Sequence, residues 1–441
     1  MKAAQPLLVW SRQELTARRS ALIRRVQEAV SSASSSTRPV FILLKGADPL
    51  YFCGTQLPVA QSSYLRYLSG CRLARCHLLI EADGPATLFF DRRTKSEETW
   101  DGVQPSDLDI CNMHAVDQIA PISSMGSYLD KLTASSSSSA SSSTIACVEP
   151  SDYADYADLI RSFRVEPANM HIDHLRLIKS PAEREAMRVA GSVGARAMAS
   201  AMRAEGGRGE GELAARILLE IRRRGGHGFA YPPVVAAGDR ACTIHYLEVE
   251  GSANVSECFL VDAGADVEGY LSDITRCWPA DRVFTPAQRT LYDALETVQL
   301  TLIQEAKKGD VVLNHLFNAM LELLGQAFEE VGLFLGSPSK KERDAIVNRL
   351  CPHHVSHYLG LDVHDSPSVS RGMRLPPGVV FTIEPAVYVH RGDPDVRQEF
   401  HGIGFRIEDD VMTSEDNSIE VLTEDCPRSV EDIEYLRSHS Q

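Results

Sequence analysis

The chain has 441 residues, which exceeds the size of one small hydrophobic core and predicts two domains. Its formal net charge of −15 argues against nucleic acid or an anionic membrane surface as the main partner. Ten cysteines lie scattered without CxxC pairs, so we expect reduced thiols rather than a disulfide framework.

The N-terminus offers a short apolar patch, PLLVW, followed by scattered arginines and Glu14. It lacks the long apolar core and the small-residue cleavage site of a secretory signal. No apolar run in the chain approaches the length of a membrane span. We therefore expect a cytoplasmic protein, and the arginines leave a mitochondrial presequence as the alternative.

Residues 1–168 are predicted to form an α/β domain. A helix-like segment over residues 12–30 comes first, and short apolar runs bounded by turn residues then predict strands. These runs cover residues 40–46, 76–84, 86–91 and 144–150. Two serine-rich stretches, 31–36 and 134–144, cannot bury apolar surface and are expected to be flexible loops.

Residues 169–441 contain two strong helix starts. The sequences SPAE at Ser180 and TPAQ at Thr285 each place a hydroxyl at the N-cap, proline next, and a carboxylate or amide two residues later. The first helix is expected to end near residue 205 and the second at residues 307–309, with another helix over 211–226. The repeated helix start indicates an internal duplication of this half of the chain.

Four acidic residues lie in apolar, strand-like runs: Asp262, Asp273, Glu384 and Glu408. The first two flank the expected hairpin turn GADVEG, and Glu408 shares a strand face with Arg406. Singly, each acid can be explained as a turn acceptor or an ordinary ion pair. Together, four carboxylates in one core would repel each other unless two divalent cations neutralised them. Oxygen ligands with one added nitrogen favour manganese, with cobalt and zinc as alternatives.

The segment HHVSHYLGLDVHD, residues 353–365, supplies candidates for the nitrogen ligand. His353 and His357 have the spacing of an HExxH zinc helix, but His354 stands where the glutamate base belongs, so we reject that motif. A dinuclear centre rich in oxygen needs one of these histidines. The others are then available as hydrogen-bond donors or proton shuttles.

The motifs LVDAGAD, SDITR, HHVSHYLGLDVHD, TIEP and GFRIEDD resemble those of one metallopeptidase family, in its order and at plausible separations. That family holds methionine aminopeptidase, prolidase and aminopeptidase P. The resemblance covers the chain from about residue 173, and it extends more weakly over the N-terminal region through QSSYLRYLSG and TWDGVQPS. The chain departs from the family's usual glycine, asparagine and glycine at His354, Arg240 and Ala386, but no ligand position is lost.

The resemblance implies the pita-bread fold, an α+β architecture with pseudo-twofold internal symmetry, for residues 169–441. It implies an N-terminal domain like that of aminopeptidase P for residues 1–168. By the same resemblance, Asp262 would bind one metal ion, Asp273 and Glu408 would bridge two ions, and His357 and Glu384 would bind the second. Glu384 would also take the proton from the attacking water.

Further residues are similar to the family's catalytic and substrate-facing positions. His364 resembles the histidine near the scissile carbonyl, and His245 and His353 resemble histidines of the substrate pocket. Arg406 is similar to an arginine at the proline side of the substrate. Arg371 falls where the organellar form of aminopeptidase P carries an arginine.

Trp100, in TWDG, resembles a tryptophan that reaches the active site of the neighbouring subunit in related dimers. A homodimer is therefore expected. The competing reading of Trp100 is an ordinary half-buried side chain.

The implied reaction is hydrolysis of the bond between a first residue and a proline at the second position, with Glu384 passing a proton to the leaving nitrogen. Proline has no N–H and bends the chain, so a pocket shaped for the ring can select it. The short segment between His364 and Glu384 favours aminopeptidase P over prolidase, which cleaves Xaa-Pro dipeptides. A metal-free peptide- or protein-binding module and a creatinase-like hydrolase are disfavoured because the five ligand positions are filled. Methionine aminopeptidase usually lacks so large an N-terminal domain.

Overall fold

The structure is a computed structural model that describes residues 8–31, 39–52, 55–56, 60–135, 144–203, 209–416 and 418–439. The chain divides into two compact units, Met1–Arg176 and Leu177–Gln441. The predicted boundary at residue 168 falls at the start of α7 (Ala168–Leu177). Most of the two serine-rich stretches lies outside the described residues.

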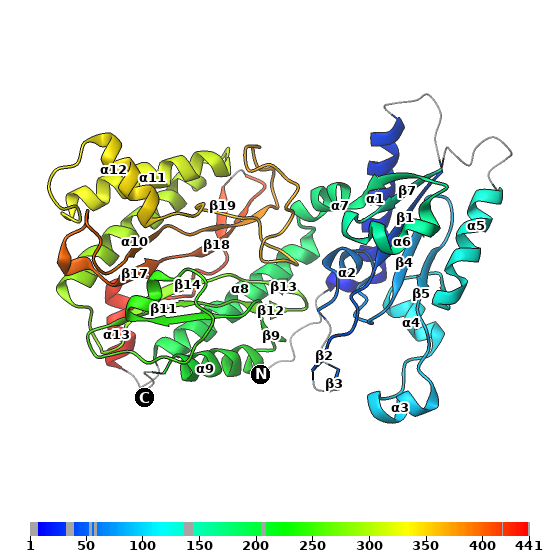
Figure 1. Ribbon diagram of the computed structural model, residues 1–441, viewed down its shortest axis with the longest axis horizontal. Coiled ribbons are helices and arrows are strands. Elements are labelled where there is room, and N and C mark those ends of the chain that lie inside the picture. The colour runs from blue at the N-terminus through cyan, green and yellow to red at the C-terminus, as the bar shows by residue number, and fades with distance from the viewer. Residues whose placement is uncertain are drawn as a thin grey trace. The chain divides into compact units, whose positions relative to one another are not determined.

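The first unit is built on a six-stranded mixed sheet of order β6-β5-β4-β1-β7-β8 (Figure 1). β1 pairs antiparallel with β4 and parallel with β7, so the predicted strands are confirmed. The strands are β1 (Val40–Lys45), β4 (His77–Glu81), β5 (Ala86–Phe89), β6 (Gln118–Ala120), β7 (Ile145–Val148) and β8 (Arg164–Pro167), with β2 (Tyr51–Phe52) and β3 (Thr55–Gln56) as a separate pair. The helices are η1 (Leu8–Trp10), α1 (Arg12–Ser31), α2 (Ser63–Ser69), α3 (Lys95–Asp101), α4 (Asp107–Met113), η2 (Ile122–Ser124), α5 (Met125–Ser135), η3 (Pro150–Asp152) and α6 (Tyr153–Ile160).

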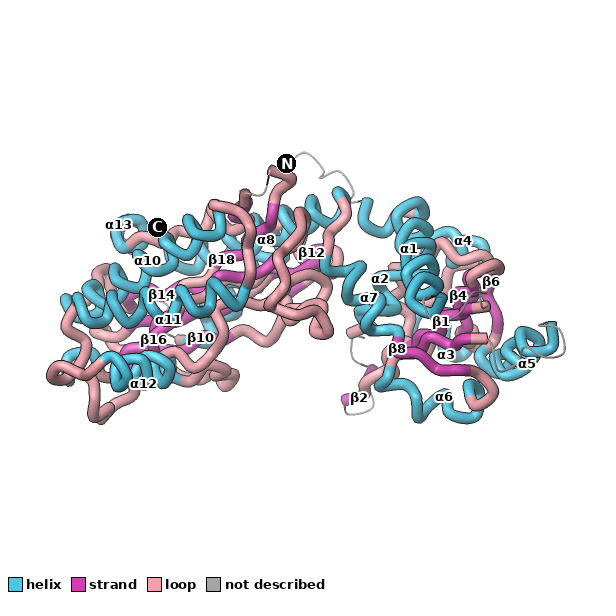
Figure 2. The backbone as a smooth tube through the Cα atoms, turned by 90° about the horizontal axis from the view of Figure 1, so that it is seen from above, coloured by secondary structure: helices cyan, strands magenta, loops and turns pink. Residues whose placement is uncertain are grey.

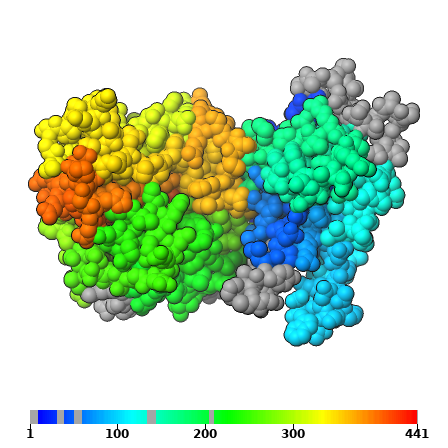
Figure 3. All heavy atoms as spheres, in the orientation of Figure 1, coloured from blue at the N-terminus to red at the C-terminus, as the bar shows by residue number. Residues whose placement is uncertain are grey.

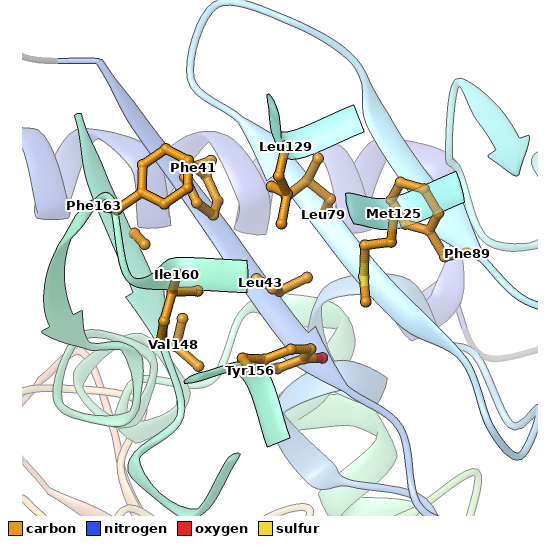
Figure 4. Close-up of a cluster of buried hydrophobic side chains, with 11 residues drawn as sticks. Phe41, Leu43, Leu79, Phe89, Met125, Leu129, Val148, Tyr156, Ile160 and Phe163 are labelled. Atoms are coloured by element: carbon orange, nitrogen blue, oxygen red, sulfur yellow. The ribbon is translucent and has the colours of Figure 1, made fainter. Parts of the chain in front are cut away.

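One face of this sheet packs under α5 and α6. Phe41 and Leu43 are two residues apart on β1 and lie on the same face of the sheet. They pack in one cluster with Met125 and Leu129 of α5 and Tyr156 of α6 (Figure 4). The period of two along the strand directs one set of side chains to this face. The intervening residues of β1 are also buried, and α1 and α2 contact the strands. Burial on both faces explains why the strand sequences are continuous apolar runs.

The second unit contains the same arrangement, helices followed by a three-stranded sheet, two times. In the first half α8 (Pro181–Met202) and α9 (Glu210–Arg223) precede β10 (Val234–Ala237), β11 (Cys258–Asp262) and β14 (Thr275–Pro279), which pair in the order β10-β11-β14. In the second half α10 (Pro286–Lys307), α11 (Leu313–Glu330) and α12 (Lys340–Leu350) precede β15 (Val380–Ile383), β18 (Asp409–Thr413) and β19 (Ile419–Val421), in the order β15-β18-β19. The remaining elements are β9 (Gly228–Phe229), η4 (Gly238–Cys242), β12 (Ala265–Val267), β13 (Tyr270–Leu271), β16 (Ala386–Val389), η5 (Gln398–Phe400), β17 (Ile403–Arg406) and α13 (Val430–Ser438).

Both predicted helix starts are confirmed as capping boxes. The Ser180 hydroxyl accepts from the Glu183 amide while the Glu183 carboxylate accepts from Ser180, and Thr285 and Gln288 do the same for α10. α8 ends at Met202, slightly before the predicted end. The long helices α8 and α10 pack on the strands of the second unit (Figure 2). On the face shown in Figure 3, the first half of this unit, in green, lies next to its second half, in yellow to orange.

The expected hairpin is present, and it contains a smaller one. β11 pairs antiparallel with β14, and β12 pairs with β13 around Glu268 and Gly269, which both have positive φ. Two close approaches then fix the chain just before Asp273. A Cβ on Gly264 would lie 1.7 Å from the Ser272 carbonyl oxygen, and one on Gly194 of α8 would lie 2.5 Å from the Ser272 hydroxyl.

The predicted placement of two acids inside strands is wrong. Asp273 lies between β13 and β14, and Glu408 lies between β17 and β18. The backbone amides of both acids bond across the two halves instead: Glu408 donates to the Thr275 carbonyl at 3.1 Å, and Asp273 donates to Asp410 Oδ2 at 3.0 Å. Among the helices that the structure describes, none combines the length and the apolar character needed to span a membrane.

Candidate metal centre and active site

Five side chains predicted as metal ligands converge in the second unit. Asp262 ends β11, and Asp273 follows β13. His357 lies in the extended and turning segment after α12, Glu384 follows β15, and Glu408 precedes β18. Each half of the duplicated unit therefore contributes acids from the ends of its strands.

The distances between these side chains fit a metal centre. His357 Nε2 lies 3.4 Å from Asp273 Oδ2, 3.5 Å from Glu384 Oε1 and 4.0 Å from Glu408 Oε1. Asp273, His357 and Glu408 are buried and offer ligand atoms that all lie within 4.8 Å of one another. Ligand atoms at about 2.1 Å from a shared ion lie roughly 3 to 3.5 Å apart, so these atoms need little movement to bind one.

Asp262 joins the cluster through Tyr231. The Tyr231 hydroxyl lies 2.6 Å from Asp262 Oδ1 and also contacts Asp273 Oδ1. A phenol carries one hydrogen and can donate it to only one of two ionised carboxylates. Its place between the two acids holds Asp262 and Asp273 toward the same point.

The electrostatics of the cluster call for added positive charge. Burial raises the pKa of Asp262 to about 7, even though Arg406 opposes the rise. Burial raises the pKa of Glu408 well above its ordinary value, and the charges of Asp273 and Glu384 raise it further. Burial alone would lower the pKa of His357, but its hydrogen bond to Asp273 and the charge of Glu384 raise it to about 9. Proton uptake here relieves a crowding of negative charge that divalent cations would relieve more completely.

The donor set therefore fits a divalent metal centre. Asp262, Asp273, His357, Glu384 and Glu408 offer carboxylate oxygens and one imidazole nitrogen in a buried site. Such a set suits manganese, cobalt or zinc.

Arg406 is held beneath the acids rather than presented to solvent. Its side chain is 3% exposed, and Nη2 donates to Asp262 Oδ2 at 2.6 Å. Nη1 donates to the Tyr388 hydroxyl at 2.6 Å and Nε to the Thr275 hydroxyl at 2.8 Å. These contacts hold the guanidinium against Asp262, a predicted metal ligand, and its predicted contact with substrate stays a prediction.

Two of the predicted histidines border the cluster. His353 Nε2 lies 3.1 Å from the Tyr388 hydroxyl, and its Nδ1 lies 3.7 Å from Glu384 Oε2. The exposed His364 sets its ring across that of His357, with centroids 4.5 Å apart at 76°. Burial lowers the pKa of both His353 and His364, which keeps them neutral at pH 7 and able to donate or accept a hydrogen bond.

The other predicted residues are more exposed. His245 lies exposed in a turn after η4, and its proximity adds to the effect of burial in lowering the pKa of the half-buried His353. Arg371 is exposed and contributes in the same way to the pKa of His364, which places its charge near that ring. Trp100 lies in α3 of the first unit with its side chain 86% exposed. A half-buried Trp100 is therefore excluded, while its role at an active site stays a prediction.

His354, which was given no role, stacks on Phe317 with ring centroids 4.6 Å apart. Its Nδ1 also lies 3.1 Å from the Ser356 amide, so the side chain is used within the fold.

Sequence reasoning missed the polar residues that contact the predicted ligands and Arg406. Tyr231, Tyr388, Thr275 and Thr382 contact Asp262, Arg406, Glu408 and Glu384 respectively. Thr275 lies inside the motif SDITR, so its position could have signalled a role. Tyr231 precedes Asp262 by 31 residues, and no spacing in the sequence points to it.

A buried cluster of acids and one histidine, drawn from both halves of a duplicated fold, suits metal-assisted hydrolysis, and the family comparisons identify the class of this enzyme as a metallopeptidase. The model of metallopeptidase family M24 matches residues 185–415, and that of the aminopeptidase P N-terminal domain matches residues 15–140. Because the first match alone spans more than half of the chain, the chain belongs to metallopeptidase family M24. Its second unit has the pita-bread fold of that family, as the sequence predicted.

Relatives match along nearly the whole chain. Xaa-Pro aminopeptidase 3 of Rattus norvegicus is 33% identical, over 98% of this chain and 87% of its own. Intermediate cleaving peptidase 55, mitochondrial, of Arabidopsis thaliana is 31% identical, over 84% of this chain and 73% of its own. The solved structure of aminopeptidase P from E. coli with the inhibitor Pro-Leu superposes with a TM-score of 0.85 and 27% identity, and covers 98% of this chain and 99% of its own.

Proposed function

We propose that this protein is a dinuclear metallo-aminopeptidase that removes the N-terminal residue from peptides with proline at the second position. The observation that carries the proposal is the convergence of Asp262, Asp273, His357, Glu384 and Glu408 in one buried cluster. Relatives that match over nearly the full length are named Xaa-Pro aminopeptidases.

The side chains of this chain divide the chemical work. When bound, two divalent ions supply an activated water and neutralise charge that develops on the substrate carbonyl oxygen. Glu384 faces His357 with one oxygen and His353 with the other, which suits it to accept the proton from the water and deliver it to the leaving nitrogen. His364 borders the same cluster on an exposed side, where it can donate to the substrate carbonyl.

Manganese is our proposal for the native ions, because four of the five ligands are carboxylates, with cobalt and zinc as alternatives. A zinc-substituted aminopeptidase P from E. coli has been solved in complex with product, so zinc fits the site of that relative.

We further propose a homodimer and a cytoplasmic location. The exposed Trp100 supports a contact with a second copy. Mitochondrial relatives, such as the intermediate cleaving peptidase of Arabidopsis thaliana, support the mitochondrion as the alternative location.

Prolidase is the second candidate, and peptide length separates the two. Manganese-loaded protein is incubated with Arg-Pro-Pro, with Ala-Pro and with Arg-Ala-Pro. We expect release of arginine from Arg-Pro-Pro and little cleavage of Arg-Ala-Pro, because the pocket selects the proline ring. Cleavage of Ala-Pro alone would assign a prolidase. No cleavage of any peptide by protein shown to contain metal would reject both peptidases in favour of a binding module.

A further inference from the structure

Thr275 is a buried hydroxyl placed between a cation and a metal-site acid. It is the first residue of β14, opposite Asp262 in the pairing of β11 with β14, and it is fully buried. Its Oγ1 lies 2.6 Å from Glu408 Oε2 and 2.8 Å from Arg406 Nε. The side chain therefore joins the first half of the unit to the acid supplied by the second half.

The direction of both hydrogen bonds is fixed by chemistry. A guanidinium N–H can only donate, so the Thr275 oxygen must accept from Arg406. The single hydroxyl hydrogen is then left for Glu408, whose carboxylate must be ionised to bind a metal ion and in that form can only accept. Arg406 thus orients the hydroxyl and polarises it toward Glu408, and bonds in such a chain strengthen each other.

The hydrogen bond from Thr275 orients the carboxylate of Glu408. With Oε2 held by Thr275, Oε1 is the oxygen nearest His357 Nε2, at 4.0 Å. A buried glutamate that is held at one oxygen loses less conformational entropy when an ion binds.

We propose that the Thr275 hydroxyl is a positioning group that holds Glu408 ready for a divalent ion and thereby sets the metal affinity of the centre. The inference rests on the proposed role of Glu408 as a ligand and goes beyond it, because Thr275 itself binds no ion. Outer groups that orient metal ligands typically contribute 10- to 100-fold in affinity.

A purely structural role is the alternative. The backbone of Thr275 also contacts Glu408, whose amide donates to the Thr275 carbonyl at 3.1 Å. That contact needs no hydroxyl and persists in any variant of the side chain. A test must therefore remove the hydroxyl while keeping the shape of the residue.

Thr275→Val does this, because valine is β-branched and of similar size. Thr275→Ser keeps the hydroxyl and removes the methyl group. Thr413→Val is the matched control: Thr413 is a buried threonine whose hydroxyl donates to the Pro376 carbonyl at 2.7 Å and accepts from the Val379 amide at 2.9 Å, both backbone groups.

Each protein is stripped with a chelator, checked for folding by circular dichroism, and titrated with Mn²⁺ in a calorimeter. We expect Thr275→Val to bind Mn²⁺ about 10- to 100-fold more weakly, and Thr275→Ser and Thr413→Val to bind as the wild type does. Thr275→Ala removes the same hydroxyl without adding an atom and replaces Thr275→Val if that variant does not fold.

Wild-type affinity in the folded variant that lacks the hydroxyl would overturn the inference. An equal loss in Thr275→Ser would also overturn it, because the methyl group and not the hydroxyl would then be responsible. Failure of the wild type itself to bind Mn²⁺, Co²⁺ or Zn²⁺ is a distinct result, and it would reject the metal centre on which the inference rests.

Discussion

At the scale of single residues, Glu384 is proposed both to bind a metal ion and to accept a proton from the attacking water. One of its oxygens faces His357 and the other faces His353. We expect Glu384→Gln to lower kcat for Arg-Pro-Pro by about 10²- to 10⁴-fold, because the amide can no longer accept the proton. Turnover and metal content per chain are measured together. Glu399→Gln, which changes an exposed carboxylate 3.0 Å from Arg397, serves as the control and should retain full activity. Equal kcat values for the two variants would remove Glu384 from the mechanism.

The histidines of residues 353–365 offer a matched pair of variants. His364→Ala should reduce kcat by about 10²-fold, since the ring borders the proposed ligand His357 and can donate to the substrate. His354→Ala should cost stability but little turnover, because His354 stacks on Phe317. Steady-state kinetics measures the turnover of both variants, and thermal unfolding measures their stability. Loss of turnover only in the His354 variant would reverse the assignment.

At the scale of elements, the loop that carries His364 is anchored by a buried ion pair. Lys179 Nζ lies 3.1 Å from Asp365 Oδ2, and both side chains are 1% exposed. Removing one partner leaves a buried charge, so Asp365→Leu should destabilise the fold by about 3–5 kcal/mol. The double variant Lys179→Met, Asp365→Leu should recover much of that loss. Thermal unfolding compares the two, and a double variant no more stable than the single would show that the pair does not anchor the loop.

Local signals predicted the elements well, and long-range pairing explains what they missed. The capping boxes at Ser180 and Thr285 involve residues three apart in sequence, so the chain alone could predict both helices. The position of Glu408 depends on its contact with Thr275, 133 residues away, and no local pattern encodes that contact. The four acidic candidates followed from the cost of burying acids in apolar runs, whereas the choice of His357 came from the resemblance to the metallopeptidase family. The polar residues that contact the predicted ligands, including Tyr231, could be identified only from the folded structure.

At the scale of the whole molecule, metal binding should stabilise the protein, and the gain should grow with pH. The charged form of His357, with its pKa raised from 6.5 to about 9, stabilises the metal-free fold below pH 6.5, and this stability is lost as pH rises through 9. Burial raises the pKa of Asp262 from 3.8 to about 7, so the folded protein favours the protonated carboxyl. The metal-free fold therefore also loses stability as pH rises from about 4 to 7 and this group ionises. Both groups must lose their protons to bind metal.

We therefore expect the Tm of chelated protein to fall between pH 6 and 9, and the increase in Tm on adding Mn²⁺ to become larger. Scanning fluorimetry across this range measures both quantities. A metal-induced increase that shrinks as pH rises would contradict the proposed protonation states.

Assembly is tested through Trp100, whose side chain is 86% exposed. If this ring reaches the active site of a second copy, Trp100→Ala should lower kcat/KM while the Tm changes little. Sedimentation velocity reports the oligomeric state of the same samples. A monomeric wild type with full activity would exclude this role.

We expect two divalent ions among five side chains drawn from both halves of the second unit. Anomalous diffraction from crystals soaked in Mn²⁺ would locate these ions. We predict two manganese peaks per chain, with Asp273 and Glu408 contacting both, Asp262 contacting one, and His357 and Glu384 contacting the other. Absence of manganese from this cluster, or peaks held by other residues, would contradict the account.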